Sequence, residues 1–139
     1  MSELNMRGSC LCGTVKYEVA PPFKLMVHCH CARCRKGTGT GHATNIIVDP
    51  GQLQWLSGET AIKRFDLPGA KSFAKWFCGN CGCPLPRHSR SGKMVIPAGS
   101  LDTAPPIKPT DHIYWESRAP WGCPDGGLPV HAEYPQTWQ

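Results

Sequence analysis

The chain of 139 residues lacks any apolar run of the roughly 20 residues that a membrane-spanning helix needs. It also lacks a segment with the 3.6-residue apolar repeat of a long amphipathic helix. Its first seven residues, MSELNMR, contain no apolar stretch typical of a secretory signal. These absences predict a cytoplasmic protein that contacts no membrane and contains few or no helices.

Glycine and proline, in contrast, are abundant, with 15 and 14 residues respectively. Both favour turns, so they indicate a mostly β fold of short antiparallel sheets. The length predicts a single domain spanning residues 1–139, with a core over about 6–132. A chain of this size can bury about two-thirds of its unfolded surface, so an ordinary apolar core is possible.

Several segments have the alternation or composition of strands. Val15, Tyr17 and Val19 alternate with polar residues, as expected for a half-buried strand. The stretches 53–56 and 62–65 flank Gly58 and predict a hairpin. A helical turn is expected at 33–37, stopped by the glycines at 37 and 39. Further strands are expected at 25–27, 43–48, 72–77, 93–98 and 112–115.

Seven of the nine cysteines form three tight clusters. Cytosolic thiols stay reduced, so clustered cysteines there bind metal more often than they form disulfides. The clusters are Cys10-x-Cys12, Cys29-x-Cys31-x-x-Cys34 and Cys78-x-x-Cys81. The alternative for the first and last clusters is two separate redox pairs, but nothing else in the chain suggests the alternating helix–strand fold of redox proteins.

The spacing predicts two Zn²⁺ ions per chain with different roles. Two cysteine pairs supply four ligands, which close a tetrahedral structural site. The triplet supplies three ligands and leaves a position for water or substrate, as catalytic zinc sites do. Four thiolates also suit iron, so the sequence favours zinc without excluding iron. The predicted structural ligands are Cys10, Cys12, Cys78 and Cys81, and those of the second zinc are Cys29, Cys31 and Cys34.

The alternative for the triplet is a second closed site. Cys83, Cys123 or a histidine would then supply the fourth ligand. Cys83 is the main rival, because it follows Cys81 by two residues and its side chain can turn away from the first metal. His28 and His30 would face away from the cysteines on a strand, so neither is expected to be a ligand.

Metal binding also changes the charge of the chain. The formal net charge is +5 with neutral thiols. Seven thiolates and two divalent ions would lower it to about +2. Since the basic residues are scattered as well, the sequence predicts no nucleic-acid partner.

The ordered motifs, with their flanking residues, resemble the glutathione-dependent formaldehyde-activating enzyme family, which includes centromere protein V. The segments 8–13, 30–36 and 77–85 carry the resemblance, together with a closing part that contains His112 and Trp121. The resemblance implies a zinc-stapled fold, sometimes called a β-tent. It assigns the cysteines to a structural and a catalytic zinc in the same partition as the spacing does.

The same resemblance implies a carbon–sulfur lyase or synthase that acts on a thiol adduct. The named reaction joins formaldehyde and glutathione into S-hydroxymethylglutathione. The alternative is a non-catalytic zinc-binding module that binds a partner.

Other residues are candidates for supporting roles in such an enzyme. A basic patch of Arg33, Arg35 and Lys36 would hold a carboxylate of the thiol, or would simply be a solvated loop. His42 or His112 would move a proton, although each fits a surface position. Trp115 and Trp121 would line the pocket, although large aromatic side chains more often pack in a core.

Overall fold

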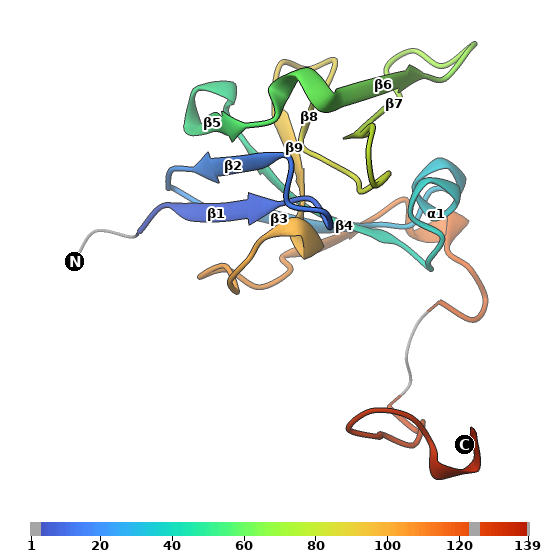
Figure 1. The fold of residues 1–139 in the computed structure, drawn as a ribbon. Coiled ribbons are helices and arrows are strands. Elements are labelled where there is room, and N and C mark those ends of the chain that lie inside the picture. Colours follow the sequence, from blue (N-terminus) through green and yellow to red (C-terminus); the bar gives the residue numbers. More distant parts are fainter. Residues whose placement is uncertain (1–3, 123–125, 139) are drawn as a thin grey trace.

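The chain folds into short β-strands with a single α-helix in its described part, so the predicted mostly β class is confirmed (Figure 1). This computed structural model describes residues 4–122 and 126–138. With η for short 3-10 helices, the elements are β1 (Met6–Ser9), β2 (Lys16–Val19), β3 (Leu25–Cys29), α1 (Ala32–Thr38), β4 (Ala43–Val48), η1 (Pro50–Gln52), β5 (Leu53–Ser57), η2 (Glu59–Ala61), β6 (Ile62–Asp66), β7 (Ala74–Cys78), β8 (Arg87–His88), β9 (Met94–Pro97), η3 (Ala98–Ser100), β10 (Asp111–Ile113), η4 (Trp115–Ser117) and η5 (Gln136–Trp138).

The strands form three sheets, in the orders β1-β2-β5, β10-β3-β4-β9-β8 and β6-β7. Every strand pair is antiparallel except β10–β3, which is parallel. The exception arises because a proline-rich connector after β9 carries the chain to the far edge of the sheet. There the Thr110 amide donates to the Met26 carbonyl at 2.7 Å and starts the new pairing.

The main core lies between the three-stranded and the five-stranded sheet. Tyr17 is fully buried in it, and its hydroxyl forms a hydrogen bond with Ser100 at 2.5 Å. A Cβ on Gly8 would collide with the Tyr17 ring, so this position in β1 requires glycine. The buried members of the core are Met6, Tyr17, Val19, Phe23, Met26, Ile46, Val48, Met94 and Ile96.

The predicted hairpin between 53–56 and 62–65 is wrong. Both segments are strands, but β5 pairs with β2 and β6 pairs with β7. Gly58, with a positive φ of 73°, precedes η2 and redirects the chain from one sheet to another. The turn at Gly58 is therefore confirmed, but long-range contacts decide with which strand each of the two segments pairs.

The helix α1 is longer than the predicted turn. Its N-cap is Cys31, whose sulfur accepts a hydrogen bond from the Cys34 amide at 3.3 Å. It continues through Gly37 and ends at Gly39, which adopts the left-handed conformation with φ 75°. Within the described ranges, no helix has the length and apolarity needed to cross a membrane.

Substitution of Ile46 tests the position of the core. Ile46→Ala should lower the free energy of unfolding by about 2–5 kcal/mol, because it leaves a cavity at a side chain that is 1% exposed. Leu56→Ala, at an exposed position of β5, should cost about 0.5 kcal/mol or less. Urea unfolding of both metal-loaded variants measures the difference, and equal losses would contradict the assigned core.

Candidate metal centre

The first metal candidate is a group of four thiols, here called the four-cysteine group. Cys10 and Cys12 follow β1, Cys78 ends β7, and Cys81 lies in the turn after it. Their sulfurs all lie within 4.8 Å of one another. The sulfur of Cys12 is 3.6 Å from that of Cys10 and 3.8 Å from that of Cys78. Tetrahedral zinc with bonds of about 2.3 Å sets sulfurs about 3.8 Å apart, so the group fits this ion.

Backbone and side-chain N–H groups point at these sulfurs and stabilise their thiolate form. The Val15 amide donates to Cys10 at 3.3 Å, and the Asn80 amide donates to Cys78 at 3.4 Å. The Asn80 side chain donates to Cys12 at 3.3 Å. Hydrogen bonding with Thr14, and then with Asn80, lowers the pKa of Cys12 to about 5. A thiol that ionises this readily suits a divalent cation. At Cys78, in contrast, the backbone N–H bonds are outweighed by burial and by hydrogen bonds with Cys10 and Cys81, which raise the pKa of this thiol to about 11, so a bound cation would displace its proton.

The four-cysteine group is also part of a small apolar core. Cys10 and Cys78 are buried and pack with Val15 and Leu85. This cluster joins the sheet that contains β1 to the β6–β7 pair. Gly79 must be small here, because a Cβ would lie 3.0 Å from the Ala61 carbonyl oxygen. The site therefore connects parts of the fold that do not share a sheet.

The second candidate, here called the three-cysteine group, surrounds the start of α1. Cys29 ends β3, Cys31 caps the helix, and Cys34 lies in its first turn. Their sulfurs also lie within 4.8 Å of one another. Among residues 4–122 and 126–138, no fourth cysteine, histidine or carboxylate joins this set. The described residues thus supply three ligand atoms that can hold a metal ion.

The three thiols are unequal in acidity. The hydrogen bond with Cys34 lowers the pKa of Cys29 to about 6. The same interaction, together with burial, strongly raises the pKa of Cys34. One proton is therefore held between the two sulfurs in the metal-free group, and a bound cation would displace it.

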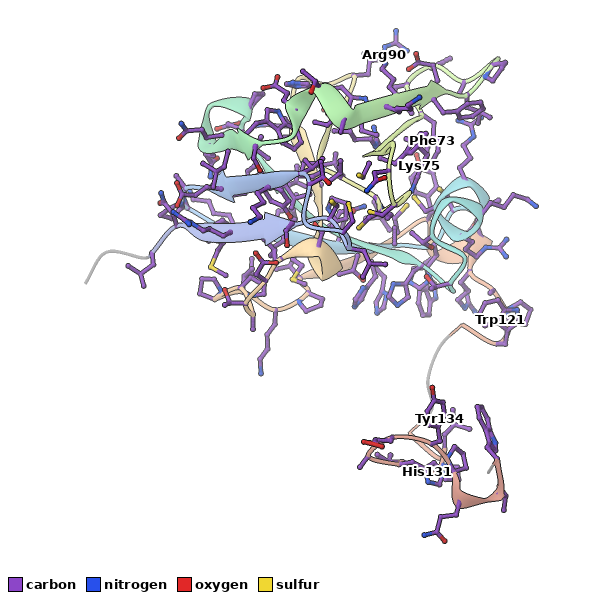
Figure 2. The ribbon with its side chains drawn as sticks, in the orientation of Figure 1. Phe73, Lys75, Arg90, Trp121, His131 and Tyr134 are labelled. Carbon is purple, nitrogen blue, oxygen red and sulfur yellow. The ribbon has the colours of Figure 1, made fainter. Side chains whose placement is uncertain are left out.

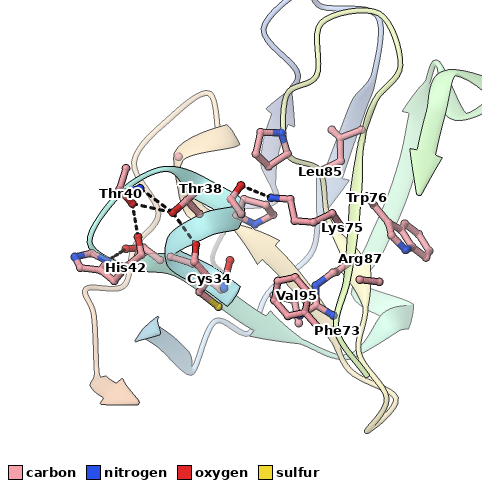
Figure 3. Close-up of a pocket in the computed structure, with 18 residues that line it drawn as sticks. Cys34, Thr38, Thr40, His42, Phe73, Lys75, Trp76, Leu85, Arg87 and Val95 are labelled. Atoms are coloured by element: carbon pink, nitrogen blue, oxygen red, sulfur yellow. Dashed lines mark hydrogen bonds between the residues drawn. The ribbon is translucent and has the colours of Figure 1, made fainter. Parts of the chain in front are cut away.

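Two adjoining cavities lie against the three-cysteine group. The larger, of about 470 Å³, is bordered by all three of its thiols. The smaller, of about 200 Å³, is bordered by Cys34 alone among them. Figure 3 shows Phe73, Lys75 and Arg87 on the wall opposite the helix that carries Cys34. Five residues border both cavities, namely Cys34, Asn45, Phe73, Arg87 and Val95.

The basic patch predicted beside the triplet contributes little to these cavities. Arg33 borders the larger one, whereas Arg35 and Lys36 border neither. The cations that sequence reasoning missed are Lys75 and Arg87. No local motif marks them, because both are brought to the site by strand pairing in β7 and β8.

Cys83 does not join the three-cysteine group. It packs against the apolar core of the four-cysteine group, and its sulfur contacts the Pro84 carbonyl oxygen at 3.6 Å. Burial raises the pKa of Cys83. The structure thus argues against Cys83 as a fourth ligand of the second metal, while Cys123 lies outside the described residues.

Four histidines gather on the other face of β3. As predicted, His28 and His30 point away from the cysteines, and neither belongs to a metal-binding group. His30 Nε2 lies 2.8 Å from His112 Nδ1, and His28 Nδ1 lies 2.7 Å from the Thr44 hydroxyl. Only His42, of the two histidines proposed for proton transfer, borders a cavity that also contains Cys34.

Trp115 and Trp121 neither wall the cavities beside the three-cysteine group nor pack in the core, the two roles expected for them. Trp115 is 41% exposed and packs edge-on against His30, on the histidine face. Trp121 is 70% exposed and points away from the body of the molecule (Figure 2). Neither borders the two cavities beside the three-cysteine group, and neither is a core residue.

Cysteine substitutions test the two groups separately. Cys34→Ser should remove one of two bound zinc ions, and Cys78→Ser should remove the other with a large loss of stability. Cys83→Ser is the matched control and should retain both ions. Elemental analysis after gel filtration measures the zinc content. An ion lost from Cys83→Ser, or two ions kept by Cys34→Ser, would contradict the assignment.

Acidification should release the two ions at different pH. Protons compete for thiolates, so affinity falls as pH falls through the ligand pKa values. Each group contains a thiol with a lowered pKa, about 6 for Cys29 and about 5 for Cys12, and another with a raised pKa, Cys34 or Cys78. The groups differ in ligand number, because three thiolates hold an ion less tightly against protons than four do. The three-cysteine group should therefore lose zinc at the higher pH. A coloured chelator measures the released zinc in the wild type and in Cys34→Ser. A single release step in the wild type would count against unequal sites.

Comparison with known proteins agrees with this geometry. The family model described as glutathione-dependent formaldehyde-activating enzyme matches residues 5–117. A Halomonas elongata protein that is provisionally named as such an enzyme is 31% identical, over 84% of this chain and 78% of its own length. The crystal structure of a Rhodobacter sphaeroides protein has a TM-score of 0.62 and 22% identity, over 77% of this chain and 99% of that one. That likeness supports the fold, and the match to the family model together with the 31% identity establishes that the chain belongs to the glutathione-dependent formaldehyde-activating enzyme family.

Proposed function

We propose that this protein is a zinc-dependent enzyme that makes or breaks the carbon–sulfur bond of a thiol–aldehyde adduct. Glutathione and formaldehyde are the proposed substrates, and S-hydroxymethylglutathione is the product. The observation that carries the proposal is the three-cysteine group, which supplies three ligands and borders a cavity of about 470 Å³. A structural site would need a fourth protein ligand, and none is present among the described residues.

The four-cysteine group would hold a structural zinc and the three-cysteine group a catalytic zinc. When bound by three thiolates, zinc supplies a position where a thiol loses its proton more readily. Cys29, Cys31 and Cys34 would fix that position at the wall of the cavity. Their sulfurs are held by the end of β3 and the first turn of α1, so the site is built on regular structure.

The bond changes of the reaction are simple. The thiol sulfur attacks the carbonyl carbon and forms the carbon–sulfur bond. The carbon–oxygen double bond becomes a single bond, and the thiol proton ends on the new hydroxyl. The described residues of the smaller cavity offer His42 as the group that relays this proton, because it borders the space next to Cys34. Its ring is positioned by the Thr44 hydroxyl, 3.2 Å from Nδ1.

Apolar side chains would keep bulk water from the reacting atoms. Val27, Ile47 and Val95 border the larger cavity together with Phe73. Exclusion of water matters in this reaction because free formaldehyde is hydrated in solution. A partly apolar wall beside the three-cysteine group favours the reactive carbonyl form over the hydrate.

Turnover with zinc-loaded protein tests the proposal. Exchange between glutathione, formaldehyde and the adduct should be faster than the spontaneous rate, as measured by NMR exchange spectroscopy. Cys34→Ser should lose the acceleration, and Cys83→Ser should keep it. A zinc-replete wild type that gives only the spontaneous rate would exclude this substrate pair and favour a non-catalytic zinc-binding module.

A further inference from the structure

Among the lysines and arginines of the described residues, Arg87 alone borders both cavities, as Cys34 does. Its backbone is fixed by the pairing of β8 with β9, in which Arg87 stands opposite Val95. Its guanidinium carbon lies 5.5 Å from the centre of the Phe73 ring. A stacked guanidinium on a strand is a well-ordered donor group.

This guanidinium has no acidic partner in the described part of the chain. None of the ion pairs there includes Arg87. Its one hydrogen bond is a long contact of 3.5 Å to the carbonyl of its neighbour His88. No aspartate or glutamate borders either cavity. Most of the five N–H donors of Arg87 are therefore left for a ligand or for water.

A second unpaired cation borders the smaller cavity. The Lys75 ammonium donates to the Gly37 carbonyl at 2.9 Å, and no ion pair of the described chain involves it (Figure 3). Burial lowers the pKa of Lys75 and also that of Arg87, as expected for cations that lack a carboxylate. With Arg33, which borders the larger cavity, the two cavities combine three cations with no acidic side chain, an environment that favours an anionic ligand.

The negative charge of the three-cysteine group would offset only part of this positive charge once the group binds a metal ion. The thiolates lie close enough to favour the charged form of Arg87. Once they bind a divalent cation, three thiolates retain a single net negative charge. A planar guanidinium with unused donors then matches a carboxylate, which accepts two parallel N–H bonds from it.

From this geometry we propose that Arg87 is a specificity-determining residue that binds a carboxylate of the substrate thiol. The inference rests on the proposed function, because it places the substrate sulfur at the three-cysteine group. It narrows the substrate class to thiols that carry a carboxylate within reach of the wall formed by Phe73 and Arg87. Neutral thiols would enter the same cavity but lack this contact.

Binding calorimetry with zinc-loaded protein tests the proposal without turnover. The probes are glutathione and glutathione diethyl ester, which keeps the thiol but lacks free carboxylates. Wild type should bind glutathione about tenfold or more tightly than the ester, as expected for a charge-assisted hydrogen bond. Arg87→Gln should lose this preference by weakening glutathione binding alone. Arg87→Lys should lose part of this preference, because the positive charge remains but the two parallel N–H donors of the guanidinium are absent.

Arg90→Gln is the matched control, since it removes the same charge from the outer end of the β8–β9 turn (Figure 2). Arg90 is exposed and borders neither cavity, so the preference for glutathione should persist. Equal affinity of wild type for both probes would overturn the proposal, as would an equal loss for both probes in Arg87→Gln.

The outcomes also separate this proposal from the proposed reaction. An Arg87-dependent preference for glutathione without turnover would leave the carboxylate site standing and remove the reaction. Turnover that Arg87→Gln leaves unchanged for glutathione and for the ester would keep the reaction and remove the carboxylate site. Zinc content confirms that each variant is loaded.

Discussion

The convergence of four cysteine thiols at one point is the constraint on which the rest of the structure depends. Cys12 and Cys78 are 66 residues apart, yet their sulfurs lie 3.8 Å from each other. Without a cation, thiolates at that distance would repel one another. A structural zinc contributes on the order of 10 kcal/mol, which is comparable to the whole stability of a small domain. The four-cysteine group joins the three-stranded sheet to β6–β7, and it includes Cys78 at the end of β7, the strand that contains Lys75.

The three-cysteine group has the same donor atoms in a different setting. Cys29 is buried at the end of β3, whereas Cys31 and Cys34 are partly exposed beside the cavities. The four-cysteine group is packed against apolar side chains such as Leu85, and its thiols border neither of the two cavities beside the three-cysteine group. The number of thiols and their access to a cavity thus distinguish the two groups, with the residue type unchanged.

Local patterns predicted the parts of the molecule that local chemistry determines. Close spacing defined the three cysteine clusters, the ligand count of zinc sites joined the first cluster to the last, and the alternation around Tyr17 indicated a core strand. The parallel pairing of β10 and the separation of β5 from β6 could not be predicted, because each strand finds its partner far along the chain. The position of Arg87 beside the cavities could not be predicted for the same reason, because it depends on the pairing of Arg87 with Val95 and not on its neighbours in sequence.

The central claim is that the two metal sites differ by one open position. X-ray absorption at the zinc edge measures it directly, because sulfur and lighter ligands scatter differently. Zinc-loaded protein should contain about 3.5 sulfur ligands per zinc on average, with the balance made up by oxygen or nitrogen. Addition of glutathione should raise the average to about four. An average of four sulfurs before glutathione is added, unchanged afterwards, would contradict the account.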